Sequence, residues 1–192
     1  MKYDLSRKPT RGAQRTLSAF SNTMFQMVSE QPFEKINVNQ LCEISNYPRA
    51  TFYNYFDDKY DLLEYCWYVL SEQVDLQQFT QIPSEKLLFV YFDRIYDLLN
   101  ERYEWLAKVL KFNSCNSSLI WGFTEYLKKQ TRKIFLSCIA SKSQQAPVDV
   151  PIELLADHYS STLLLVLEWI FFKQNKVDKE AAHKYLRKLL AI

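Results

Sequence analysis

Glycine is nearly absent from this sequence. Among its 192 residues there are only two, Gly12 and Gly122. Tight β-hairpin turns favour glycine at positions with positive φ, and dinucleotide-binding folds need glycines in their phosphate-binding loop. The scarcity of glycine therefore argues against both architectures and favours an all-helical protein.

Residues that bind metals are also few. The chain has two histidines, and its four cysteines are widely spaced and form no CxxC pair. These six residues are His158, His183, Cys42, Cys66, Cys115 and Cys138. Structural zinc sites take four Cys or His ligands, usually in closely spaced pairs. We therefore expect no metal site and no cofactor, and we interpret the cysteines as reduced thiols in the core.

Long hydrophobic runs are missing as well. The most apolar stretch, residues 163–172, is interrupted by Glu168. It is far shorter than the about 20 residues that span a bilayer. We see no signal peptide, so we expect a cytoplasmic protein that has no membrane partner.

Positive charge is concentrated at the start of the chain. The formal net charge is +2, and residues 1–59 hold eight bases and six acids, so all of the excess lies in the first third. Within it, residues 1–15 carry five bases and one acid. A basic arm beside a compact domain is typical of a nucleic-acid-binding protein. The other interpretation of the arm is a solvated terminus without a partner.

Helical periodicity continues along nearly the whole sequence. Apolar spacing predicts a first helix over residues 11–29, which Pro32 prevents from continuing. Asn37 is placed to cap a short second helix, and a turn at residues 45–47 precedes a third helix that Pro48 opens. Further helices are predicted over residues 58–78, 84–100, 102–112, 119–140, 152–174 and 178–190. Residues 113–118 and 141–151 are predicted loops. The fold class is therefore all-α, with about nine helices.

The second and third helices form a candidate helix-turn-helix over residues 37–56, because both are short and a three- or four-residue turn joins them. In such a motif the second helix enters the DNA major groove and presents its N-terminal residues to the bases. Arg49 can bind guanine O6 and N7 with its forked guanidinium, and Ala50 allows close approach. Thr51 can reach a phosphate or a thymine methyl group.

Four further side chains extend this candidate DNA surface. The hydroxyl groups of Tyr53 and Tyr55 are placed to reach phosphate oxygens, and Asn54 can serve a base or the backbone. Lys59 adds positive charge near the start of the next helix.

Phe52 and Phe56 are expected to be buried against the first helix. The alternative is that all four rings of residues 52–56 belong to the core. Helical geometry opposes this alternative, because four rings at five positions cannot all face one side.

Residues 33–63 resemble the DNA-binding domain of TetR-family transcriptional regulators, and the resemblance covers about residues 11–70. The matching positions are Thr51, Phe52, Tyr53, Tyr55, Phe56, Lys59 and Leu62. Two positions depart from the family pattern, since Asn46 replaces the usual turn glycine and Pro48 replaces the usual Ser or Thr cap. The resemblance implies that the residues facing DNA are Asn37, Arg49, Ala50, Thr51, Tyr53, Asn54, Tyr55 and Lys59.

The resemblance also implies two domains and a dimer. Residues 1–59 would form the basic arm with the N-terminal three-helix DNA-binding domain, and residues 60–192 a C-terminal helical regulatory and dimerisation domain. The helix over 152–174 is apolar on nearly all sides, as expected of a helix buried by its own core and by a partner. The expected interface residues are Leu155, Tyr159, Thr162, Leu163, Val166, Trp169 and Ile170. A homodimer would bind a palindromic operator in double-stranded DNA.

Aromatic side chains are frequent in the second domain and allow two interpretations. They can line a pocket for a small apolar or aromatic effector, or they can simply fill the hydrophobic core. The rings assigned to the pocket are Trp67, Phe92, Tyr96, Trp105, Trp121 and Phe123.

These features together predict a dimeric, sequence-specific repressor that a small-molecule effector controls. The alternative is a TetR-like helical protein that acts mainly through a protein partner, as a coregulated activator without a small-molecule ligand. We do not expect an enzyme, because the sequence has no paired acid–base motif and no phosphate-binding loop.

Overall fold

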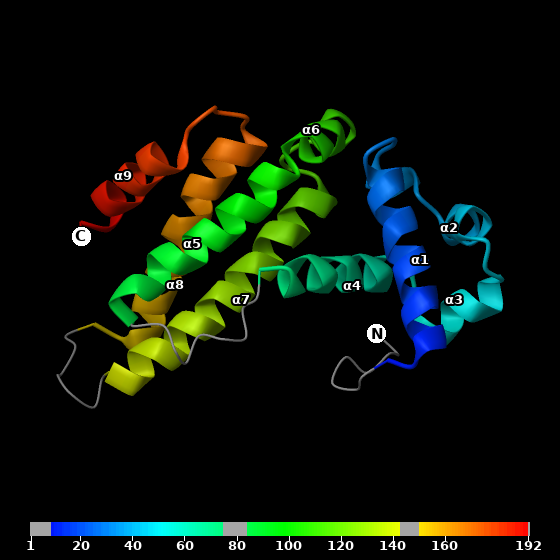
Figure 1. Ribbon diagram of the computed structural model, residues 1–192, viewed down its shortest axis with the longest axis horizontal. Coiled ribbons are helices and arrows are strands. Elements are labelled where there is room, and N and C mark those ends of the chain that lie inside the picture. Colours follow the sequence, from blue (N-terminus) through cyan, green and yellow to red (C-terminus); the bar gives the residue numbers. More distant parts are fainter. Residues whose placement is uncertain (1–8, 75–83, 143–149, 192) are drawn as a thin grey trace. The chain divides into compact units, whose positions relative to one another are not determined.

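The computed structural model describes residues 9–74, 84–142 and 150–191, and within these ranges every regular element is a helix (Figure 1). This confirms the predicted all-α fold. The elements are α1 (Arg11–Val28), the 3₁₀ helix η1 (Phe33–Lys35), α2 (Val38–Ser45), α3 (Arg49–Tyr55), α4 (Lys59–Glu72), α5 (Ser84–Glu101), α6 (Tyr103–Phe112), α7 (Ser118–Lys142), α8 (Ile152–Leu167), the π-helix η3 (Glu168–Phe172) and α9 (Lys179–Leu190).

The chain divides into two compact units. The first comprises Met1–Leu70 and Ala107–Ser114, and the second comprises Ser71–Leu106 and Cys115–Ile192. The domain boundary expected between residues 59 and 60 lies at the start of α4, whereas most of α4 belongs to the first unit.

The first unit is built around α1. Helix α2 packs against α1, and α3 packs against α2 (Figure 1). Phe20 of α1 is fully buried, and its ring centroid lies 5.3 Å from that of Phe52 and 6.2 Å from that of Phe56. Both of these phenylalanines are also fully buried. The prediction that they hold the third helix against the first is therefore confirmed.

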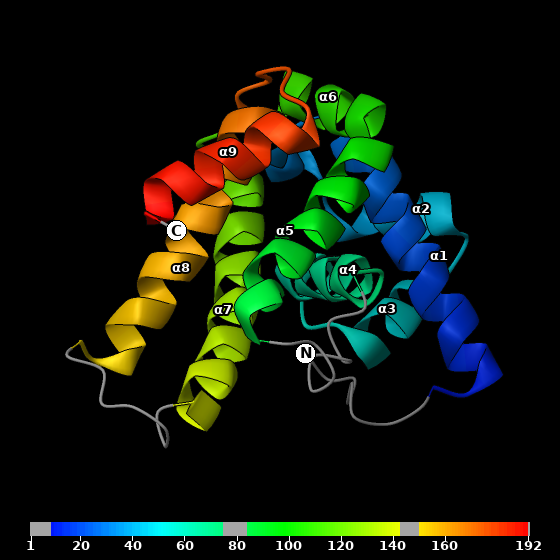
Figure 2. The same ribbon diagram turned by 60° about the vertical axis from the view of Figure 1, so that its left-hand side comes forward.

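The second unit is a bundle in which α5, α7 and α8 lie side by side (Figures 1 and 2). Helix α9 packs against α8 and α5. The core of this unit is rich in aromatic rings, because the apolar faces of α5 and η3 carry Tyr91, Phe92 and Phe171, which are all fully buried.

Some element boundaries differ from the predicted ones. Helix α4 was expected to continue to residue 78, but it ends at Glu72. The predicted loop at 141–151 begins with two residues that continue α7. The sequence did not predict the π-helix η3. An apolar run is compatible both with backbone hydrogen bonds to the fourth residue back, as in an α-helix, and with bonds to the fifth, as in a π-helix. Its last bond joins Lys173 N–H to the carbonyl of Glu168 at 3.0 Å.

Three further expectations concern ligands, membranes and the termini. Among the described residues, no group of three or more His, Cys, Asp or Glu side chains gathers to hold a metal ion. In the same part of the chain, no helix combines the length and the apolar character needed to cross a membrane. The start of the basic arm (1–8), the end of the predicted fourth helix (75–78) and the side chain of Cys138 lie outside what the structure describes.

Candidate nucleic-acid interface

Asn37 and Asn46 set the two ends of α2. The Asn37 side chain accepts a hydrogen bond from Gln40 N–H, and the Gln40 side chain accepts one from Asn37 N–H, both at 3.1 Å. This reciprocal capping box fixes the start of the helix. Asn46 ends it in the left-handed conformation (φ 58°), and Tyr47 N–H then donates to the carbonyl of Cys42 at 3.0 Å. Asparagine tolerates this conformation, which explains how it replaces a turn glycine.

Helix α3 follows this turn directly and exposes most of the residues predicted to face DNA. Pro48 precedes the helix with φ −61° and, as expected for proline, supplies no side-chain cap. Arg49, Ala50, Tyr53 and Asn54 are exposed, whereas Thr51 and Tyr55 are half-buried. With Phe52 buried on the opposite side, the helix has one face in the core and one face in solvent.

Arg49 and Tyr53 form a pair on the exposed face of α3. Arg49 Nη2 lies 3.3 Å from the Tyr53 hydroxyl oxygen, to which it donates. The guanidinium carbon also lies 5.8 Å from the centre of the Tyr53 ring, within the range of a cation–π interaction. Burial raises the pKa of Cys42 on α2, and the positive charge of Arg49 opposes that rise.

Lys59 makes contacts that the sequence did not predict. Its Nζ donates hydrogen bonds to the carbonyl oxygens of Phe33 at 3.0 Å, Glu34 at 3.0 Å and Ile36 at 2.9 Å. An ammonium group has three N–H donors, and these carbonyls use all three. Burial lowers the pKa of Lys59, while the nearby Glu34 and Asp58 carboxylates oppose this change. Lys59 therefore holds η1 in place with all three donors, and its expected contact with a DNA phosphate stays a prediction.

Asn113 fastens the same segment from the other side, and the sequence did not single it out. Its Oδ1 accepts from Phe33 N–H at 2.8 Å, and its Nδ2 donates to the carbonyls of Val28 at 2.9 Å and Val109 at 3.1 Å. The residue is 1% exposed. Its partners at residues 28 and 33 lie more than 70 positions away in the chain, so no local pattern reveals them. Asn113 and Lys59 together hold the segment that leads into α2.

Other described residues of the first unit expose charges of both signs. Exposed bases lie on α1 (Arg11 and Arg15) and on η1 (Lys35). After α3, Asp58 caps α4 by accepting from Tyr60 N–H at 2.8 Å and Asp61 N–H at 2.9 Å. This cap keeps one carboxylate of the segment engaged with the protein backbone.

No protein-family model and no curated protein sequence matches the chain significantly. Solved structures do match it. A TetR-family transcriptional regulator from Syntrophomonas wolfei superposes with a TM-score of 0.70, over 93% of this chain and 94% of that chain, at 14% identity. The chain has the TetR fold.

Two other structures agree with this fold. A transcriptional regulator from Pseudomonas aeruginosa PAO1 matches with a TM-score of 0.67 and 13% identity, over 97% of this chain and 92% of that chain. A fatty acid degradation regulator from Bacillus halodurans matches with a TM-score of 0.66 and 15% identity, over 96% and 97% of the two chains. At identities this low, the likeness establishes the TetR fold alone.

Within the TetR fold, the expected dimer residues of α8 and η3 mostly face the core of their own chain. Four of the seven are buried, namely Thr162, Leu163, Val166 and Ile170. Leu155 and Tyr159 are half-buried, and Trp169 is 39% exposed. The exposed apolar side chains are Leu154, Leu165 and Trp169 on α8 and η3, and Tyr185 and Leu189 on α9. The assignment of the four buried residues to a surface is therefore wrong, because packing within the chain already covers them.

The rings assigned to an effector pocket do not gather in one place. Phe92 and Phe123 are buried in the core of the second unit, and Trp121 is 65% exposed. Trp67 belongs to the first unit, and Trp105 is half-buried on α6. Of the six rings, only Tyr96 lines the pocket that lies beside residues 175–178 in the second unit. For Phe92 and Phe123, the interpretation as core residues agrees with their burial.

Proposed function

We propose that this protein is a sequence-specific DNA-binding transcriptional regulator in which α3 enters the major groove. The observation that carries this proposal is the division of α3 into two faces. Phe52 and Phe56 anchor the helix to Phe20, while Arg49, Ala50, Tyr53 and Asn54 remain exposed. A short helix held in this way can insert its N-terminal residues between the phosphate backbones.

Specific roles follow from the chemistry of the exposed side chains. Arg49 is suited to guanine, since a guanidinium can bond to O6 and N7 together. Ala50 allows the helix to approach closely, and Asn54 can bind a base edge or the backbone. Thr51, Tyr53 and Tyr55 carry hydroxyl groups that can donate to phosphates. Asn37 can also donate to a phosphate through its amide Nδ2, because its capping bonds use only Oδ1 and the backbone N–H.

We further propose that the regulator is a homodimer and acts as an effector-controlled repressor on a palindromic operator. Support for the dimer comes from exposed apolar residues on two adjacent helices. The Trp169 and Tyr185 rings lie 5.9 Å apart in a T-shaped arrangement and join the exposed faces of η3 and α9. We define the Trp169–Tyr185 surface as Leu154, Leu165, Trp169, Tyr185 and Leu189. A second copy of the chain would cover these side chains symmetrically.

The test is direct binding to DNA taken from upstream of the protein's own coding sequence. Fluorescence anisotropy with a labelled duplex should show specific binding, and a scrambled duplex of the same composition is the control. Affinity should fall steeply with salt, because phosphate contacts release counterions. If the double variant Arg49→Ala, Tyr53→Phe binds the specific duplex as tightly as the wild type, the assignment of α3 as the reading helix is wrong.

A further inference from the structure

A pocket of about 440 Å³ lies in the second unit beside the segment that joins η3 to α9. Helices α5 and α6 contribute Tyr96, Asn100 and Tyr103, while η3 contributes Ile170 and Phe171. Residues 175–178 complete the lining. The volume falls within the range of small-molecule sites, about 300–1,000 Å³.

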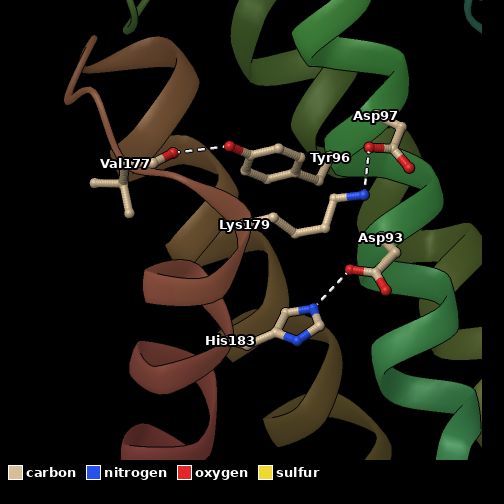
Figure 3. Close-up of polar contacts among 6 residues, drawn as sticks. All are labelled: Asp93, Tyr96, Asp97, Val177, Lys179 and His183. Carbon is tan, nitrogen blue, oxygen red and sulfur yellow. Dashed lines mark hydrogen bonds and ion pairs between the residues drawn. The ribbon is translucent and has the colours of Figure 1, made fainter.

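The segment that forms one wall of this pocket is fastened to α5 (Figure 3). The Tyr96 hydroxyl donates to the carbonyl of Val177 at 2.8 Å. At the first residue of α9, Lys179 Nζ lies 2.5 Å from Asp97 Oδ1, and one turn further along His183 Nε2 lies 2.6 Å from Asp93 Oδ1. A pocket whose wall is already held in place loses little conformational freedom when a ligand binds.

The π-helix shapes the other wall. Asn175 Nδ2 donates to the carbonyl of Trp169 at 2.7 Å, which folds the chain back after η3. The Phe171 ring lies 5.1 Å from the Tyr96 ring in a T-shaped arrangement. Both rings are almost fully buried, so the apolar surface that a ligand can reach comes from the half-buried Val177 and the ring of Tyr103, which suit an aromatic body. π-Helical turns occur frequently at functional sites.

Among the described residues that line the pocket, two carry charge and they have opposite signs. Lys176 is exposed and forms no ion pair with any described residue. Asp178 caps α9, where its Oδ1 accepts from Ala181 N–H at 2.8 Å. This bond uses one carboxylate oxygen, so the second oxygen remains to accept from a ligand. The amides of Asn100 and Asn175 and the Tyr103 hydroxyl add neutral polar groups.

We propose that this pocket binds a small zwitterion with an aromatic body, of the chemical class of an aromatic α-amino acid. The ligand's carboxylate pairs with Lys176, its ammonium group pairs with Asp178, and its ring packs against Tyr103 and Val177. The ligand acts as the effector of the regulator. This last step rests on the proposed function, whereas the binding itself does not.

Calorimetric titration of the full chain with L-phenylalanine tests the proposal. Two analogues each lack one charge, since 3-phenylpropionate has no ammonium group and phenethylamine has no carboxylate. Two variants remove the partners, Lys176→Gln and Asp178→Asn. Asparagine keeps a side-chain oxygen that can cap α9, so the second variant preserves the helix start. Lys188→Gln, at an exposed position on α9, is the matched control.

L-phenylalanine should bind saturably, and each variant should bind it about tenfold more weakly, because each loses one charge-assisted hydrogen bond. Lys176→Gln should not weaken phenethylamine, and Asp178→Asn should not weaken 3-phenylpropionate. The Lys188→Gln control should match the wild type. Absence of L-phenylalanine binding, or binding that neither variant weakens, overturns the proposal.

Anisotropy with the upstream duplex separates this proposal from the proposed function. If L-phenylalanine binds and changes the DNA affinity of the wild type but not of Asp178→Asn, the effector role is supported. If DNA binds but L-phenylalanine does not, the pocket proposal fails and the proposed function stands. If L-phenylalanine binds through both charged residues but no DNA does, the proposed function fails and the pocket assignment stands.

Discussion

The guanidinium of Arg49 is held by Tyr53, one helical turn further along α3. Nη2 donates to the tyrosine hydroxyl at 3.3 Å, and the guanidinium carbon lies 5.8 Å from the ring centre. Residues four apart on a helix are neighbours on its surface, so α3 itself supplies the geometry. Ordering a long arginine side chain before it binds reduces the entropy lost on binding.

The first prediction concerns this pair. Arg49→Ala should weaken binding to the specific duplex by about 1–3 kcal/mol, the contribution of one bidentate contact to guanine. Tyr53→Phe should have a smaller effect, because it keeps the ring beneath the guanidinium and removes only the hydroxyl. Anisotropy titrations measure both changes. Lys129→Ala removes an exposed charge from α7 in the second unit and should leave the affinity unchanged.

The second prediction separates the two roles considered for Lys59. Lys59→Met keeps the apolar stem but leaves three carbonyls without their donor, so we expect a loss of about 1–3 kcal/mol in the free energy of unfolding. The slope of log affinity against log salt concentration should stay as in the wild type. If Lys59 instead contacts a phosphate, that slope decreases by about one.

Lys35→Met is the matched control for stability. Lys35 is exposed on η1, the element that Lys59 fastens. An exposed substitution of this kind should change the free energy of unfolding by less than about 0.5 kcal/mol. Equal losses in the two variants would contradict a specific role for Lys59.

The third prediction concerns Asn113. Asn113→Ala should lower the free energy of unfolding by about 2–4 kcal/mol, because it leaves the Phe33 N–H and the Val28 carbonyl without a partner in a buried site. Asn113→Asp should also destabilise, since a carboxylate cannot donate to the carbonyls of Val28 and Val109. Urea denaturation measures the changes. Asn116→Ala, at an exposed position of the next loop, should be nearly neutral.

The fourth prediction tests the Trp169–Tyr185 surface as the dimer interface. Leu165 and Leu189 are 51% and 52% exposed and lie one turn from Trp169 and Tyr185 respectively. Leu165→Asp or Leu189→Asp should convert the dimer to a monomer, because each places a charge within an apolar interface. Sedimentation equilibrium gives the mass. Trp121→Asp changes an apolar residue that is 65% exposed and lies outside this surface, so it should leave a dimer.

The fifth prediction is a pH dependence at Glu168. Burial raises the pKa of this carboxyl group, and Lys173 and a hydrogen bond from Thr124 oppose the rise. A raised pKa means that the fold favours the protonated form, so stability is lost as the pH rises through the folded-state pKa. Glu168→Gln should therefore stabilise the protein at neutral pH and not at a pH well below the ordinary pKa of glutamate. Thermal unfolding measures this difference, and Glu104→Gln, at an exposed site, should show none.

The helix-turn-helix was predictable from the sequence because its signals are local. The capping box at Asn37, the left-handed turn at Asn46 and the burial of Phe52 each depend on residues within about one or two turns of the same segment. The alternation of inward and outward rings on α3 follows from 3.6 residues per turn alone. The exposed face containing Arg49 and Asn54 therefore matched the expected one.

The contacts of Lys59 and Asn113 and the exposed side of α8 were not predictable, because they depend on residues that are distant in the chain. Lys59 bonds to carbonyls 23 to 26 positions away, and Asn113 bonds to residues 80 and 85 positions away. Leu163 and Leu165 have the same hydrophobicity, yet one is fully buried and the other is 51% exposed. Only the packing of α8 against α7, α9 and α5 distinguishes them.

The sequence by itself determined the helical character of the chain and the exposed face of α3, because both depend on spacing along one segment. The tertiary structure decided which polar side chains hold the first unit together, which side of α8 remains exposed and where a pocket opens beside η3. Those outcomes depend on residues that are distant in the chain, and hydrophobicity alone carries no information about which of them will meet.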